Sequence, residues 1–233
     1  MTSHTVVVGA STGVGLATAR RFAARGDRLT LIARSEAGLV EAAASIGGNP
    51  RVLALDMKDG NGVSKAFAQD TIDHVVLTAV AGEMSRLARL AELTSVQIEA
   101  SFDKLRGYVS FLQAVLPNLA ERASITMLCG LSAVRPGKSG FALLAAESAS
   151  IAALGKALSL ELAPRRVNVL MCGVLNTAIH GEDRSGLRAW AESDLPARHL
   201  GEPEDAADYV FALANNRYAT GGVATLDGGL ALI

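Results

Sequence analysis

A glycine-rich turn follows directly on a short apolar run near the start of the chain, in residues 6–17 with the sequence VVVGASTGVGLA. The three valines predict a strand, and a helix is expected to begin within the turn. Gly9 permits a sharp turn off the strand, Gly13 leaves room for a close backbone approach, and Gly15 lets the helix pack near the strand. Free amide groups and the positive end of the helix dipole would then face an anion.

The turn therefore predicts a seat for a pyrophosphate group. Its spacing, Gly-x3-Gly-x-Gly, differs from the Gly-x-Gly-x-x-Gly of the commonest dinucleotide fingerprint. A glycine-rich connection that binds no ligand stays open as the alternative reading of this segment alone.

Apolar runs of strand length alternate with helical segments along the whole chain. This alternation is typical of right-handed crossovers that build one parallel sheet with helices on both faces. We therefore predict an α/β Rossmann-type fold, a doubly wound seven-stranded parallel sheet in a single domain over residues 1–233. The expected strands are 4–8, 28–33, 51–55, 73–79, 124–129, 166–171 and 222–226, and the expected helices are 14–25, 36–46, 62–69, 95–119, 139–162 and 203–214.

Residues 176–201 are the least regular stretch of the chain and contain its only tryptophan, Trp190. Ligands of open parallel sheets bind beyond the carboxyl ends of the strands, where this segment begins. We interpret it as a candidate substrate lid, in which His180 and Trp190 would either contact a substrate or pack within the loop.

The composition excludes several classes of partner. The 22 basic and 23 acidic residues give a net charge of -1, which offers no attraction to nucleic acid or an anionic membrane. Residues 140–163 are the most apolar long stretch, but Glu147, Lys156 and Glu161 favour a helix buried on a broad face over a membrane span. The start of the chain leaves no room for a signal peptide, and two cysteines indicate neither a disulfide framework nor a metal site. We expect a cytoplasmic protein.

Several segments, in order, resemble the signatures of the short-chain dehydrogenase/reductase family over nearly the whole chain. After the glycine turn come Asp56, TAVAG at 78–82, LSLELAP at 158–164, CGVLNT at 172–177 and GEPEDAA at 201–207. Two departures are Val8, where the family usually has Thr, and TAVAG in place of Asn-Asn-Ala-Gly. The resemblance implies a nicotinamide-dependent oxidoreductase whose cofactor is held by Gly9, Ser11, Thr12, Gly13, Val14, Gly15, Arg34, Ser35, Asp56, Met57, Ala79, Val80, Ala81, Gly173, Leu175 and Thr177.

The end of the second predicted strand indicates which cofactor binds. An enzyme that prefers NAD places a carboxylate there, which accepts from the ribose 2′-hydroxyl. This chain has Arg34 and Ser35 instead, a cation and a hydroxyl that suit a 2′-phosphate. We therefore predict NADP(H), with the alternative that Arg34 stacks on adenine or lies in solvent.

The resemblance fails at the positions that carry the family's chemistry, a Tyr and a Lys on one helix with a Ser and an Asn on other elements. Counting from Glu161 places Leu144 at the Tyr position and Ser148 at the Lys position. The Ser position falls on Gly130 or Leu131, and the Asn position on Lys104. None of the three tyrosines, Tyr108, Tyr209 and Tyr218, restores the pattern. The ordinary Tyr-assisted carbonyl reduction is therefore not expected.

Two residues are the candidates for a replacement chemistry. Lys104 would project into the space left by the missing lysine, where its ammonium could bind the ribose or act as an acid; the alternative is a surface lysine. Ser132 could bind a substrate oxygen, or be a turn residue.

Three further residues lie near the same place in the expected fold. Cys129 and Cys172 end two strands, and we interpret them as packing residues because no histidine is placed to activate either thiol. Glu147 lies one residue before Ser148 and could face solvent, a partner subunit or the site.

Three hypotheses follow. The first is an atypical NADP(H)-dependent oxidoreductase of unknown small carbonyl or alcohol substrate, in which Lys104 or Ser132 supplies the polar group. The second is a catalytically inactive NADP(H)-binding sensor or interaction protein, and the third a non-redox enzyme using the same pocket. The resemblance implies helix packing between subunits, and the alanine-rich residues 142–160 suit it, so we expect a homodimer or homotetramer.

Overall fold

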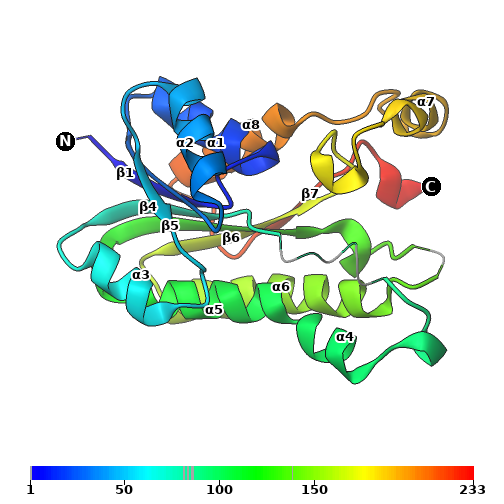
Figure 1. Cartoon of the computed structure of the whole chain (residues 1–233), viewed down its shortest axis with the longest axis horizontal. Coiled ribbons are helices and arrows are strands. Elements are labelled where there is room, and N and C mark those ends of the chain that lie inside the picture. The colour runs from blue at the N-terminus through cyan, green and yellow to red at the C-terminus, as the bar shows by residue number, and fades with distance from the viewer. Residues whose placement is uncertain (1, 81, 83, 85–86, 138) are drawn as a thin grey trace.

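The computed structural model describes residues 2–80, 82, 84, 87–137 and 139–233. One parallel sheet of seven strands runs through the molecule in the order β3-β2-β1-β4-β5-β6-β7 (Figure 1). This order, with β1 and β4 adjacent at the centre, confirms the predicted doubly wound Rossmann-type sheet. The strands are β1 His4–Val8, β2 Arg28–Ala33, β3 Arg51–Ala54, β4 Ile72–Leu77, β5 Leu119–Gly130, β6 Arg166–Cys172 and β7 Val223–Leu226.

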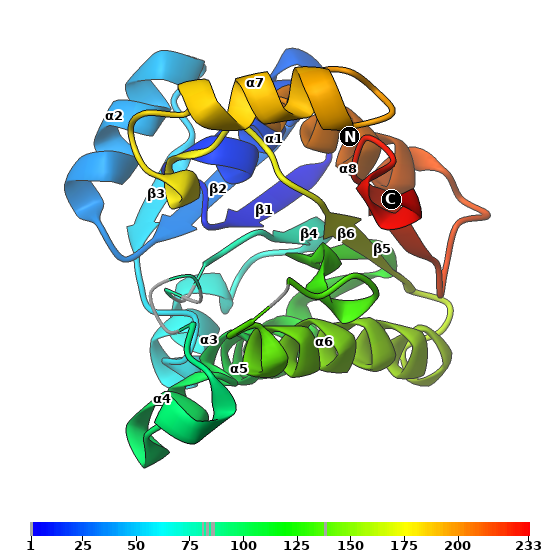
Figure 2. The same ribbon diagram turned by 90° about the vertical axis from the view of Figure 1, so that its right-hand side faces the viewer.

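Helices cover both faces of the sheet, as Figure 2 shows in the view along its edge. One layer holds α1 Gly13–Ala24, α2 Glu36–Ile46 and α8 Pro203–Asn215, and the opposite layer holds α3 Gly60–Phe67, α5 Asp103–Val115 and α6 Ala142–Glu161. Two short helices, α4 Ser95–Ala100 and α7 Ser185–Asp194, lie at the periphery.

The strands are apolar on both faces because each face is covered. In β1, Val6 and Val8 pack in the core under α3, α5 and α6, whereas Val7 packs in the core under α1, α2 and α8. This explains why β1 is a continuous apolar run and lacks the alternation of a strand with one wet face. Phe22 of α1 and Phe111 of α5 fill the two cores without exposure to solvent.

The predicted helix over 95–119 is wrong, because the chain breaks into two helices there. Thr94 caps α4 through Gln97, the Ser101 hydroxyl donates to the Gln97 carbonyl, and α5 begins at Asp103. None of the residues of α4 is buried, whereas α5 buries a full apolar face against the sheet. The break lets α5 lie on the sheet while α4 lies outside it.

The strand β5 is twice as long as the prediction of 124–129, since it begins at Leu119. Pro117 lies in a 3-10 turn after α5, and Leu119 already pairs with Ile72 of β4. The register between these strands then shifts, so that His74 pairs with Ser124. The polar run Glu121–Arg122 therefore lies inside a strand, which its composition does not indicate.

The helix α6 differs from its prediction in the amount it buries. Only Glu147, Ser148, Ile151, Ala152 and Gly155 are buried, a narrow stripe rather than a broad face. By its length and a mean hydropathy of 1.3, α6 is also apolar enough to cross a membrane, and 28% of the apolar segment is buried. The expectation that its charged residues exclude a membrane span is therefore not supported by composition alone. Core helices of soluble proteins pass the same test, and α6 packs on β5 and β6.

A partly buried histidine at the amino-terminal side of the sheet makes the fold sensitive to acid. The Nδ1 atom of His74 lies 2.7 Å from the Ser124 hydroxyl, and the ring lies against Phe22. Burial, followed by the charge of Arg25, lowers the pKa of His74 from 6.5 to about 4. The imidazole is therefore neutral in the folded protein at neutral pH.

We predict that stability falls as the pH drops from 6.5 to 4, because the unfolded chain then binds a proton at His74 that the folded chain does not. The loss attributable to this residue is about 3 kcal/mol at most. His74→Asn keeps a hydrogen-bonding group for Ser124 but does not titrate, so its urea midpoints at pH 7 and pH 4.5 should differ less than those of the unmodified protein. Equal differences for both proteins would contradict the assignment.

Candidate functional site

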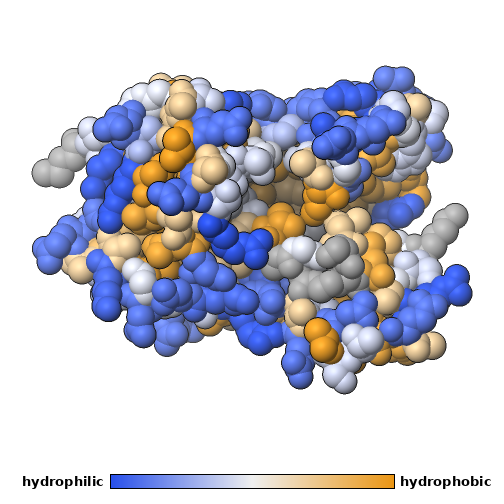
Figure 3. Space-filling model, in the orientation of Figure 1, coloured by the Kyte–Doolittle hydropathy of each residue, from blue (hydrophilic) through white to orange (hydrophobic). Residues whose placement is uncertain are grey.

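A cavity of about 520 Å³ opens at the carboxyl ends of the central strands, between the two helical layers. In the view of Figure 3 the surface is hollowed there, with apolar atoms inside. This position, where β1 and β4 lead to connections on opposite faces, is the switch point at which open α/β sheets bind ligands.

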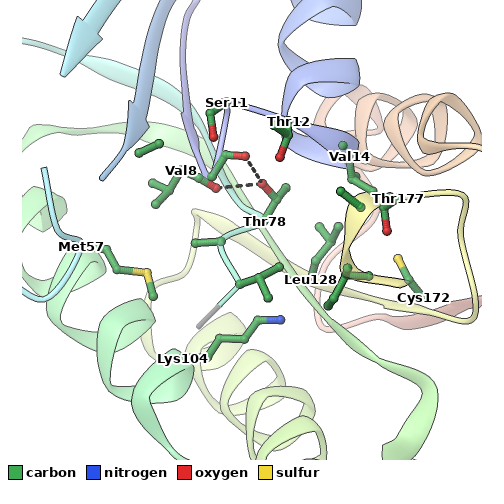
Figure 4. A pocket seen from close by; sticks show the side chains of 18 of the residues that line it. Val8, Ser11, Thr12, Val14, Met57, Thr78, Lys104, Leu128, Cys172 and Thr177 are labelled. Atoms are coloured by element: carbon green, nitrogen blue, oxygen red, sulfur yellow. Dashed lines mark hydrogen bonds between the residues drawn. The ribbon is translucent and has the colours of Figure 1, made fainter. Parts of the chain in front are cut away.

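The glycine turn forms one wall of the cavity through contacts that exclude side chains. Gly9 has a positive φ of 91°, and a Cβ atom there would lie 2.6 Å from the amide nitrogen of Ala79. A Cβ on Gly15 would lie 2.0 Å from the carbonyl oxygen of Gly9. The Thr78 hydroxyl donates to the Val8 carbonyl at 2.8 Å and so links the ends of β1 and β4 (Figure 4). The predicted role of Gly15 in close packing is confirmed by this geometry.

The first turn of α1 faces the cavity with its amides available. The first amides of a helix have no partner within the helix, and the cap residue Thr12 gives them no side-chain hydrogen bond. The first turn of α1 contains no acidic residue. Gly13, with φ of 53°, lies opposite Thr177, whose methyl group would be 3.4 Å from an added Cβ. An uncapped, carboxylate-free helix start within a cavity fits the pyrophosphate of a dinucleotide.

Arg34 and Ser35 line the cavity and are exposed. The Ser35 hydroxyl accepts from the Gly38 amide at 3.2 Å and caps α2, which leaves its proton available. Within the described residues, no ion pair or hydrogen bond engages the Arg34 guanidinium. Asp56 accepts from the Lys58 amide at 2.9 Å, which fixes the turn after β3.

The structure brings the predicted cofactor residues together although they come from five parts of the chain. Ala81 lies outside the described residues. Each of the others lines the cavity: Gly9, Ser11, Thr12, Gly13, Val14, Gly15, Arg34, Ser35, Asp56, Met57, Ala79, Val80, Gly173, Leu175 and Thr177.

Lys104 lines the cavity from the start of α5. It is the second residue of α5, its side chain is 9% exposed, and Figure 4 shows its amine directed into the cavity, on the side away from Ser11 and Thr12. Its Nζ atom lies 5.8 Å from the centre of the Tyr108 ring, and its backbone amide donates to Glu147 Oε1 at 3.2 Å. The alternative of a surface lysine is therefore wrong.

Ser132 lies behind the wall of the cavity and is not among the lining residues that the structure describes. Its hydroxyl donates to the Leu144 carbonyl at 3.3 Å and lies 3.2 Å from the Ser148 hydroxyl. Leu144 and Gly130 line the cavity in front of this pair. Ser132 would have to leave these partners to meet a ligand.

Both thiols that line the cavity are poor nucleophiles. Burial raises the pKa of Cys129 to about 11, with Lys104 opposing the shift and Glu147 adding to it. Burial raises the pKa of Cys172 to about 12. The two side chains therefore stay protonated, in agreement with their interpretation as packing residues.

The candidate lid divides into a part that lines the cavity and a part that does not. Residues 177–180 line the cavity, and burial lowers the pKa of His180, so its imidazole is neutral at pH 7. Trp190 of α7 instead packs on a separate apolar cluster with Leu195 and Leu200. Of the two aromatic candidates, His180 lies at the cavity and Trp190 serves the packing of the loop.

Among the residues of the cavity that sequence reasoning missed are Thr78 and an ion pair of Lys58 with Asp103. Thr78 links β1 to β4. The only indication of this role in the sequence is that a threonine stands where the family has an asparagine. Lys58 and Asp103 line the cavity as an ion pair of 3.5 Å, between residues 45 positions apart that no local pattern connects.

Residues 9–231 of the chain match the model of a protein family described as Enoyl-(Acyl carrier protein) reductase. The chain belongs to the short-chain dehydrogenase/reductase family. The 3-oxoacyl-[acyl-carrier-protein] reductase of Bos taurus is 28% identical, over 97% of this chain and 97% of its own length.

Solved structures of short-chain dehydrogenase/reductases share the fold. One from Brucella melitensis, named as a glucose/ribitol dehydrogenase, superposes with a TM-score of 0.89 at 27% identity, covering 97% of this chain and 96% of its own. A small-chain dehydrogenase in complex with NADPH superposes with a TM-score of 0.81 at 28% identity, covering all of both chains.

Proposed function

We propose that this protein is an NADP(H)-dependent oxidoreductase that acts on a small carbonyl or alcohol substrate through an atypical proton-transfer group. Family membership supports the oxidoreductase class. The observation that carries the proposal is one cavity that joins an uncapped helix start to a buried lysine.

The preference for NADP(H) over NAD(H) rests on the end of β2. Arg34 and Ser35 are exposed at the cavity, and no carboxylate takes their place at this strand end. A guanidinium matches the charge of a 2′-phosphate and has nothing comparable to bind on a 2′-hydroxyl. The small-chain dehydrogenase that matches over its full length holds NADPH.

Arg34→Ala should weaken NADPH binding about tenfold or more, because a hydrogen bond to a charged group is lost. NADH binding should change little, since NADH has no 2′-phosphate. Arg122→Ala, an exposed arginine on β5, is the matched control. Titrations followed by cofactor fluorescence measure both constants, and an equal loss for NADPH and NADH would contradict the role of Arg34.

Lys104 is the proposed source of the proton. When bound, the nicotinamide supplies or accepts the hydride at the substrate carbon. In reduction, Lys104 Nζ would donate a proton to the carbonyl oxygen, and in oxidation it would take that proton back. At 9% exposure, the Lys104 side chain has little contact with bulk water and lies within the cavity.

The atypical site is proposed from what lies at the positions that align with the family's catalytic set. Leu144 lines the cavity at the tyrosine position, and the Ser148 hydroxyl at the lysine position is buried against Ser132. The hydroxyl of Tyr108 is bound to the carbonyls of Leu77 and Leu128. The described lining residues that can ionise include Lys104, His180, Asp56, the paired Lys58 and Asp103, and two thiols with raised pKa values. Of these we propose Lys104 as the proton donor.

A binding protein without turnover is the second candidate. The engagement of Ser132 with Ser148 and Leu144 favours it, because no serine hydroxyl then faces a substrate in this part of the described cavity. The two functions differ in one respect: the binding protein would hold NADPH tightly and oxidise none of it. A non-redox enzyme in the same pocket would likewise leave NADPH intact.

Lys104→Ala should lower the rate of NADPH oxidation about 100-fold or more, because the proton donor is lost. The assay is the decrease in NADPH absorbance with a panel of ketones, aldehydes and enones. Lys65→Ala, an exposed lysine of α3, is the control and should keep full activity. Activity that survives Lys104→Ala contradicts the proposed donor, and tight NADPH binding without any turnover favours the second candidate.

The proposal extends to assembly and location. Leu160 of α6 is 83% exposed and Val109 of α5 is 43% exposed, which supports a homodimer or homotetramer that covers these helices. Light scattering should give the mass of two or four chains, and a monomer at micromolar concentration would contradict it. The balanced charge supports a small molecule as the substrate, with neither nucleic acid nor membrane as partner, and we propose that the protein acts in the cytoplasm.

A further inference from the structure

The start of α5 carries Lys104 into the cavity and is held from two sides. Toward β3, the side chain of Met57 fills the space over Gly107, where an added Cβ would lie 2.9 Å from its sulfur. Lys58 pairs with Asp103, the first residue of α5, at 3.5 Å. These contacts fix the helix start relative to the turn that follows β3.

On the other side, the helix start meets a buried carboxylate. Glu147 of α6 is 2% exposed, and its Oε1 atom accepts the backbone amide of Lys104 at 3.2 Å. Lys104 is the second residue of α5, so its amide is one of those that the helix itself cannot satisfy. Phe102, at the cap position, gives no side-chain hydrogen bond. Glu147 therefore acts as a cap supplied by a different helix.

A buried carboxylate is costly unless positive charge lies nearby. The positive end of the α5 dipole lies at the Glu147 carboxylate, and the Lys104 ammonium and Glu147 both lie near enough to Cys129 to act on the same thiol. The Nζ atom of Lys104 in turn lies 5.8 Å from the centre of the Tyr108 ring. The hydroxyl of Tyr108 lies within hydrogen-bond distance of the carbonyls of Leu77 and Leu128, which holds the ring in place. Backbone and side chain of Lys104 are thus each fixed by a buried neighbour.

We propose that Glu147 is a positioning residue for Lys104: its buried carboxylate anchors the backbone of Lys104 and offsets the charge of the ammonium, and so holds the amine in the cavity. The role of Lys104 as proton donor rests on the proposed function. The interaction between Glu147 and Lys104 does not depend on it. It explains why an acidic residue stands in the buried stripe of α6, next to Ser148.

Other ionisable groups also face this region and have to be kept constant in a test. Among the described residues they are Asp103 and Tyr108 of α5, Lys58 after β3, Cys129 of β5, Cys172 of β6 and His180 of the candidate lid. Lys104 and Glu147 act in opposite directions on the pKa of Cys129, as groups of opposite charge near one thiol must.

The first test measures the pKa of Lys104 directly. Acetic anhydride labels unprotonated amines, and mass spectrometry of the Lys104 peptide across a pH series gives the pKa without cofactor or substrate. In Glu147→Gln the carboxylate is lost, the ammonium is less favoured, and the pKa of Lys104 should fall by about one unit. Glu161→Gln, the same change at an exposed position of the same helix, should leave it unchanged.

The second test asks whether Glu147 acts through Lys104. Adenosine 2′,5′-bisphosphate, which lacks the nicotinamide half, should bind Glu147→Gln as well as the unmodified protein, which also reports that the variant is folded. NADPH should bind both Lys104→Ala and Glu147→Gln more weakly, by about fivefold to tenfold. The double variant should be no weaker than Lys104→Ala alone, because the carboxylate then has no ammonium to hold.

An unchanged Lys104 pKa in folded Glu147→Gln, or additive losses in the double variant, would overturn the inference. If Glu147→Gln does not fold, Glu147→Asp takes its place. Its carboxylate lies farther from Lys104 by one methylene, so the pKa of Lys104 should fall by a smaller amount. An unchanged pKa in this variant also overturns the inference. Failure of the proposed function is separate, since it shows as turnover that survives Lys104→Ala while the pKa shift persists.

Discussion

The contact between Gly15 and the carbonyl of Gly9 determines the geometry of the whole cofactor end. Any side chain at this position would collide with the carbonyl of Gly9. Gly15 has no side chain, so α1 can begin almost against the end of β1. This brings its free amides to the edge of the sheet, where Thr78 has joined β1 to β4. Arg34 follows from the same arrangement, since β2 lies beside β1 and ends at the same edge.

The two ends of the cavity are built from different materials. The end at α1 consists mostly of backbone: glycines, a helix start and a turn, whose geometry fits a pyrophosphate group. The end at α5 consists of side chains from three elements: Lys104 of α5, Cys129 of β5 and Leu144 of α6. Groups of the backbone keep their positions when side chains elsewhere in the chain are substituted, whereas a group supplied by a side chain is lost by a single substitution. The family's fold and cofactor seat can therefore persist while the groups at the reacting end differ.

Much of the fold could be predicted because it depends on local patterns. The strands β1 and β2 and the helix α2 lie where their apolar periodicity, caps and glycines indicate. The errors fall where tertiary contacts decide. The helix expected over 95–119 breaks because α4 has no surface to bury, and β5 starts early because Leu119 finds a partner in Ile72. Neither cause is visible in the residues of the segment itself.

The sequence by itself determined the doubly wound sheet and the glycine turn, because strand periodicity and the needs of a tight turn act over a few neighbouring positions. The resemblance of its motifs to a family supplied most of the other residues expected at the cofactor end. Only the tertiary structure decided the other end. It buried Lys104 in the cavity and turned Ser132 away from it, and it brought Glu147 to the backbone of a residue 43 positions distant. Those outcomes depend on how α5 and α6 pack on the sheet, and the distance in sequence carries no signal of which side chains such packing brings together.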